Sequence, residues 1–169
     1  MKTLRPGFQI IVGLTGVLLA APAGAAQTGG CGAFAWPIAA DLELLAQPGW
    51  VKSGATADVA GPVGFRLELK EDASADFVLP PQRRSAPRSQ GGTLRFEARP
   101  GVYQITLTET AWTDLVQGGQ ALQPTEFSGV TDCEGARKTL RYELSAGPAT
   151  LQISNAPGRS IGLALTPPR

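Results

Sequence analysis

The residues of this sequence best able to do chemistry are tryptophans near acidic side chains. Trp112 lies two positions before Asp114, and Trp50 is a second tryptophan beside turn residues. An indole ring can stack on the apolar face of a sugar while a neighbouring carboxylate accepts hydrogen bonds from its hydroxyl groups. We therefore take Trp112, Asp114 and Trp50 as candidate ligand-binding residues, with a glycan as the ligand. Packing in a hydrophobic core is the alternative for each ring, and it is our prediction for Trp36 and for both tyrosines.

Catalysis is constrained most by the absence of histidine from the sequence. Without histidine there is no Ser-His-Asp or Cys-His machinery, no His-ligated zinc and no iron site with two histidines. A pair of carboxylates could still hydrolyse a glycosidic bond. The candidates lie between positions 109 and 134 and are Glu109, Asp114, Glu126, Asp132 and Glu134. Solubilising surface groups are the simpler interpretation, so we predict no catalytic residue, no cofactor and no metal, with a carboxylate hydrolase as the less favoured alternative.

The two cysteines, Cys31 and Cys133, are predicted to form one disulfide bond. Such a bond would close a loop of about 100 residues and stabilise the fold by roughly 2–4 kcal/mol. The alternative is lipidation of Cys31. Against it, no leucine occupies the third position before Cys31, and the preceding apolar run ends well upstream.

Residues 1–26 are typical of a cleavable export signal. Lys2 and Arg5 precede the apolar run 8–21, and small residues follow up to Ala26, where we expect cleavage. The run is shorter than the roughly 20 residues of a membrane-spanning helix. We therefore expect a periplasmic or secreted protein with no transmembrane segment in the mature chain, a retained membrane anchor being the alternative.

The rest of the chain must position the candidate residues, and its pattern is that of strands. Apolar and polar residues alternate with period two, glycine and proline separate the segments, and Gly118-Gly119 is a plausible hairpin turn. Alternating segments occur at 63–69, 93–98, 103–108, 140–144, 151–154 and 161–165. We predict that 27–169 form a single all-β domain, an antiparallel β-sandwich of jelly-roll, immunoglobulin-like or carbohydrate-binding-module-like type. Segment 38–46 is either one helical turn or an edge strand.

Segment 80–92 is polar, rich in turn residues and basic, and it is predicted to be an exposed loop. Its Arg83, Arg84 and Arg88 are candidates for binding, with a solvated loop as the simpler interpretation. Without Lys2 and Arg5 the mature chain is close to neutral, which excludes a basic surface for nucleic acid.

Four stretches resemble an uncharacterised family of exported proteobacterial β-domain proteins. They are 31–37 (CGAFAWP), 101–107 (GVYQITL), 111–119 (AWTDLVQGG) and 132–138 (DCEGARK). The resemblance spans essentially the whole mature chain and implies no activity. Some relatives carry a homogentisate 1,2-dioxygenase label, which does not fit a chain without histidine to bind iron. The ending 147–153 also resembles the last strands of carbohydrate-binding sandwiches, which bears on the fold more than on the ligand.

These observations together predict an exported, non-catalytic β-sandwich that binds a glycan or another ligand of the cell envelope. The alternative is a structural or protein-interaction module of the envelope, which would use a sheet edge or the arginine loop.

Overall fold

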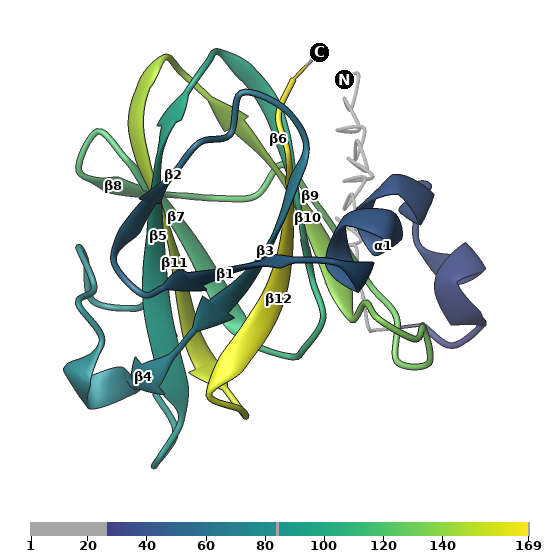
Figure 1. Cartoon of the computed structure of the whole chain (residues 1–169), viewed down its shortest axis with the longest axis horizontal. Coiled ribbons are helices and arrows are strands. Elements are labelled where there is room, and N and C mark those ends of the chain that lie inside the picture. Colours follow the sequence, from purple (N-terminus) through teal and green to yellow (C-terminus); the bar gives the residue numbers. More distant parts are fainter. Residues whose placement is uncertain (1–26, 84, 169) are drawn as a thin grey trace, which may run out of the picture.

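The computed structural model describes residues 27–83 and 85–168, and the predicted export signal 1–26 and Arg84 lie outside the described residues. Two sheets face each other (Figure 1). Sheet I contains, in spatial order, β1 (Gly49–Lys52), β3 (Val63–Glu68), β12 (Ser160–Thr166), β6 (Gly101–Leu107), β10 (Lys138–Leu144) and β9 (Glu126–Gly129). Sheet II contains β2 (Ala55–Ala57), β5 (Gln90–Ala98), β11 (Gly147–Ala156), β7 (Trp112–Gln117) and β8 (Gln120–Leu122), with β4 (Lys70–Glu71) beside β5.

The predicted all-β sandwich with one disulfide is confirmed, but its sheets are mixed. β1 runs parallel to β3, and β2 runs parallel to β5, whereas the other strand pairs are antiparallel. A period-two pattern fixes which side chains face the core but not the direction of the neighbouring strand, because both pairings present the same alternation. The sequence pattern therefore could not reveal these two parallel pairings.

The main core lies between the sheets and is built from the inward positions of the alternating segments. Leu67, Ile105 and Leu163 are fully buried there, as are Tyr103 and Tyr142. Each tyrosine hydroxyl has a backbone partner: that of Tyr103 accepts a bond from Arg99 N at 2.9 Å, and that of Tyr142 donates to the Thr113 carbonyl at 3.3 Å. The predicted core role of both tyrosines is confirmed.

The hairpin predicted at Gly118-Gly119 joins β7 to β8. Both glycines have positive φ angles, 60° and 76°. A two-residue turn of this kind matches the twist of the flanking strands and favours residues that tolerate positive φ. The turn brings β8 alongside β7 and makes it the last strand of sheet II.

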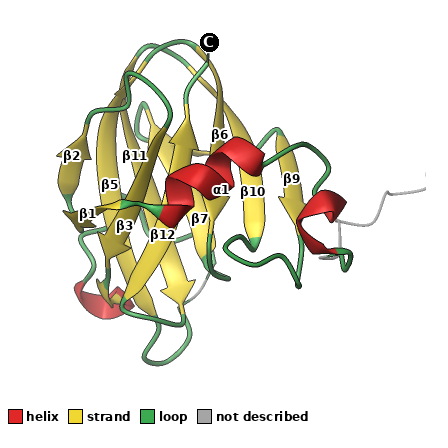
Figure 2. Ribbon diagram, turned by 45° about the vertical axis from the view of Figure 1, so that its right-hand side comes forward, coloured by secondary structure: helices red, strands yellow, loops and turns green. Residues whose placement is uncertain are grey.

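Segment 38–46 forms helix α1 (Ala39–Ala46), which lies across the outer face of sheet I (Figure 2). A second apolar cluster fills the space beneath it and includes Trp36, Leu45 and Ala164. The helix approaches the sheet closely at Gly64, where an added Cβ would lie 2.2 Å from the Leu44 carbonyl oxygen. Two short 3-10 helices, Gly30–Ala33 and Asp72–Ser74, complete the structure. Trp36 is only 9% exposed, as its predicted core role requires.

Candidate functional site

Trp112 borders a hollow of about 380 Å³ at one end of the sandwich, which we call the cationic hollow. Its walls come from the loop after residue 80, from the start of β7 and from the connection between β9 and β10. Arg83, Arg137 and Lys138 line it, together with the rings of Trp112 and Phe127, and none of the described lining residues is acidic. The Phe127 side chain is 46% exposed. The hollow therefore offers aromatic surface and positive charge in the same place.

The Trp112 ring is held in position by Asp114. The indole Nε1 donates to Asp114 Oδ1 at 2.8 Å, and Asp114 Oδ2 accepts a bond from the Gln82 backbone N–H at 3.1 Å. Asp114 is only 3% exposed, so both of its oxygens are engaged inside the protein. The structure thus brings Trp112 and Asp114 together as predicted, but Asp114 orients the indole and the loop instead of facing a ligand.

Two cations flank this pair. The Arg83 guanidinium lies 5.8 Å from the centre of the Trp112 ring, within the range of a cation–π contact. The Lys138 ammonium donates to the Ala111 carbonyl. Burial lowers the pKa of Lys138 to about 8, with the carboxylate of Asp114 acting against this shift and Arg83 adding to it. Lys138 is therefore mostly protonated at neutral pH.

The loop that carries Arg83 is fastened to sheet II along its length. Gln152 Oε1 accepts bonds from Val78 N at 2.6 Å and Leu79 N at 3.1 Å, and Asn155 Oδ1 accepts one from Ala86 N at 2.7 Å. At the far end the Ser89 hydroxyl donates to the buried Asp72 at 2.7 Å. Strand β5 begins at Gln90, so the exposed loop predicted at 80–92 is three residues shorter. Most of its described side chains are exposed as predicted, but Gln152 and Asn155 of β11 anchor its backbone.

Trp50 is far from this hollow in the topology. It lies on β1, the outermost strand of sheet I at the end opposite β9, and it is 69% exposed. Trp112 lies on β7, which belongs to sheet II. The two candidate tryptophans are therefore both accessible but do not share a face.

The other acidic residues between positions 109 and 134 lie in surroundings different from that of Asp114, so they do not supply it with a partner carboxylate. Glu126 pairs with Arg141 at 2.8 Å, and Glu109 and Glu134 line a separate hollow of about 470 Å³ beside α1. Among the described residues, no group of three or more acidic or cysteine side chains is placed to hold a metal ion. No helix in the described ranges is long and apolar enough to cross a membrane.

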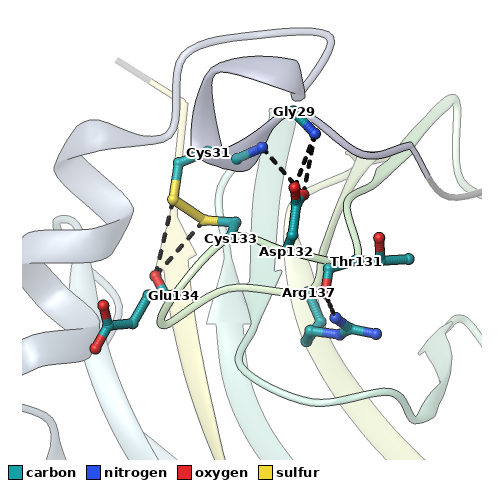
Figure 3. The surroundings of a disulfide bond; sticks show 8 residues. Gly29, Cys31, Thr131, Asp132, Cys133, Glu134 and Arg137 are labelled. Atoms are coloured by element: carbon teal, nitrogen blue, oxygen red, sulfur yellow. Dashed lines mark hydrogen bonds between the residues drawn. A yellow bond between two sulfur atoms is a disulfide. The ribbon is translucent and has the colours of Figure 1, made fainter.

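The predicted disulfide Cys31–Cys133 is present and belongs to a group of contacts that we call the N-terminal clasp (Figure 3). The Asp132 carboxylate accepts bonds from the backbone N–H groups of Gly29, at 3.0 and 3.1 Å, and Gly30, at 3.0 Å. The bond from Gly29 is the main cause of the lowered pKa of Asp132. Gln27 continues the clasp, since its N–H donates to the Gly129 carbonyl at 2.9 Å and its carbonyl accepts from Thr131 N at 2.9 Å.

Sequence reasoning missed three residues of the cationic hollow: Phe127, Arg137 and Lys138. They lie on or next to β9 and β10, which pair in sheet I, whereas Trp112 lies in sheet II. The exposure of Phe127 and its place on an edge strand are properties of the structure, so no local sequence pattern pointed to the hollow. Comparison with protein-family models, curated proteins and solved structures finds no match to this chain.

Proposed function

We propose that this protein is an exported, non-catalytic ligand-binding module and that it binds an acidic glycan in the cationic hollow. The observation that carries the proposal is the composition of the hollow. Two aromatic rings and three cationic side chains line it, with no acidic residue among its described walls. The disulfide fits an oxidising compartment such as the periplasm or the cell exterior.

The chemistry of an acidic glycan matches these walls. The indole N–H is already bound to Asp114, so the part of Trp112 left for a ligand is its apolar ring. Arg83, Arg137 and Lys138 are the partners that a carboxylate, sulfate or phosphate on a sugar requires. A ring that stacks and an anionic group that pairs with arginine would both be satisfied in one hollow.

The test is a calorimetric titration with oligogalacturonate, which is an acidic glycan. Maltooligosaccharides of the same length serve as the uncharged control ligands. We expect oligogalacturonate to bind more tightly, with an affinity that falls as salt is added. Trp112→Ala should weaken binding about tenfold, which corresponds to about 1.4 kcal/mol.

Two further variants keep this test decisive. Arg83→Ala changes an exposed loop residue and should weaken oligogalacturonate binding without affecting the folded core. Trp50→Ala removes an exposed tryptophan that does not line the hollow and should leave binding unchanged. Equal affinity for the two glycans, or an unchanged affinity in both Trp112→Ala and Arg83→Ala, would refute the proposal.

The second candidate function, a protein-interaction module of the envelope, is favoured by one observation. Trp50 is 69% exposed on the short edge strand β1, whose outer edge has no neighbouring strand among the described residues. An open edge and a large exposed ring are features of partner surfaces. Crosslinking in the native envelope should then capture a stoichiometric partner from the wild type and not from Trp50→Ala.

A further inference from the structure

A second hollow, which we call the inter-sheet pocket, opens between the two sheets next to the cationic hollow. Its volume is about 370 Å³, within the range of small-molecule sites. Sheet II contributes Thr113 and Leu122 to its walls, and sheet I contributes Phe127 and Leu140. Leu140 belongs to the main core, so this pocket reaches from the surface to the apolar interior.

The two hollows share three wall residues: Trp112, Phe127 and Lys138. They differ in character. The cationic hollow carries Arg83 and Arg137, whereas the inter-sheet pocket has Lys138 as the one charged residue among its described walls. A charged surface site therefore lies directly beside an apolar opening into the sandwich.

One buried polar atom on the wall of the inter-sheet pocket has no hydrogen-bond partner among the described residues. The Thr113 side chain is only 6% exposed, and its hydroxyl makes no hydrogen bond with any described residue. A buried hydroxyl without a partner costs free energy, which a polar atom of a bound ligand can recover. This observation points to a ligand independently of the shape and charge of the hollows.

An anionic amphiphile fits both hollows at once. Its charged head would lie against Arg83, Arg137 and Lys138. The carbonyl oxygen of its acyl group would accept a hydrogen bond from the Thr113 hydroxyl, and its apolar chain would lie among Leu122, Phe127 and Leu140. Building on the ligand-binding function proposed above, we infer that the inter-sheet pocket binds the acyl chain of an anionic ligand whose head occupies the cationic hollow. The bound molecule would then be an acylated acidic compound instead of a bare glycan.

The experiment is a calorimetric titration of the whole protein with ligands that share one tail but differ in the head: octanoate, 1-octanol and octylamine. Acetate has the same head as octanoate but lacks the tail. We expect octanoate to bind at least tenfold more tightly than each of the other three. Equal binding of octanoate and octanol would overturn the role of the anionic head, and equal binding of octanoate and acetate would overturn the role of the chain.

Two variants separate the pocket from the hollow. Leu122→Trp fills the inter-sheet pocket from the half-buried side of β8, and it should abolish octanoate binding while leaving oligogalacturonate binding intact. Gln120→Trp adds the same ring at an exposed position on β8 and should change neither. Thr113→Val keeps the shape of the wall but removes the hydroxyl that would donate to the ligand, so it should weaken octanoate binding severalfold. Unchanged octanoate binding in both Leu122→Trp and Thr113→Val would contradict the inference.

The outcomes also distinguish this inference from the proposed function. If oligogalacturonate binds and octanoate does not, the acyl site falls and the glycan site stands. If octanoate binds in a way that depends on Arg83 and Leu122 while oligogalacturonate does not bind, the glycan falls and the anionic amphiphile stands.

Discussion

The connection between β9 and β10 serves two regions of opposite character, the N-terminal clasp and the cationic hollow. Its first half holds the N-terminal segment through Asp132 and Cys133. Its last residue, Arg137, and the first residue of β10, Lys138, line the hollow. In the clasp, the carboxylate of Asp132 is satisfied by backbone donors and the cysteines are joined covalently. In the hollow, aromatic and cationic groups face an opening. The clasp thus fixes one end of the connection in the fold, whereas the other end borders an open hollow.

The largest expected effect comes from breaking the clasp. Replacing Cys31 and Cys133 together by serine should lower the free energy of unfolding by about 2–5 kcal/mol, because the unfolded chain regains the freedom of a long closed loop. Urea unfolding monitored by circular dichroism measures the change. Binding of oligogalacturonate to the folded variant should be weakened little, since neither cysteine lines the hollow. An unchanged unfolding free energy would show that the clasp does not stabilise the fold.

The next effect tests the layer that covers sheet I on the side of the clasp. Gly64→Ala should destabilise the protein by about 1–3 kcal/mol, because the new methyl group would clash with the Leu44 carbonyl and force α1 away from the sheet. Gly49→Ala is the matched control, since an added Cβ there meets nothing within 4 Å. Thermal unfolding of both variants compares them, and equal melting temperatures would contradict the close approach of the helix.

The pH dependence of stability tests whether the Lys138 ammonium is desolvated beside the hollow. Its pKa of about 8 in the folded protein lies below the ordinary 10.5, so the unfolded chain binds more protons between these values. The free energy of unfolding should therefore rise with pH from about 8 to 10, by at most about 1.4 kcal/mol per pH unit. Lys138→Met should remove this rise.

The comparison with Lys138→Met is needed because another group titrates at higher pH with the opposite sign. Burial raises the pKa of Tyr142, so this residue favours unfolding as the pH rises beyond about 10. Both proteins share Tyr142, and the difference between their urea-unfolding curves isolates Lys138. Parallel curves from pH 8 to 10 would show that the Lys138 ammonium is not desolvated.

The smallest effect concerns Asp132 in the clasp, whose carboxylate is exposed. Its pKa is lowered from 3.8 mainly by the Gly29 N–H, so its contribution is complete above that pH and is lost as the pH falls through the folded-state value. Asp132→Asn should show a slightly lower melting temperature near neutral pH and a shallower loss of stability on acidification. The same loss of stability on acidification in both proteins would show that the Asp132 carboxylate does not stabilise the clasp.

The fold was predictable where apolar and polar residues alternate along the chain. The inward positions of β6, β10 and β12 follow from their sequences alone, as does the turn at Gly118-Gly119. Segment 38–46 remained ambiguous because a helix of two turns carries little periodicity of its own, and its contacts with Gly64 and Ala164 decide the outcome.

The candidate site was predictable only in part. Trp112 and Asp114 are neighbours on one strand, so their proximity follows from local sequence. Phe127 and Lys138 reach Trp112 only because β9 and β10 lie in the opposing sheet, and no local pattern encodes that juxtaposition. The anchoring of the arginine loop by Gln152 and Asn155 likewise depends on contacts between residues distant in sequence.

The central claim is that the hollow beside Trp112 binds ligand while the clasp remains a closed structural element. The most direct measurement is a ¹H–¹⁵N NMR titration of the oxidised protein with oligogalacturonate and, separately, with octanoate. We predict that the indole N–H of Trp112 and the amides of Phe127 and Lys138 shift with both ligands, while those of Gly29 and Gly30 move little. Shifts confined to Trp36, Trp50 or the clasp, or no shift at Trp112 with either ligand, would contradict the account.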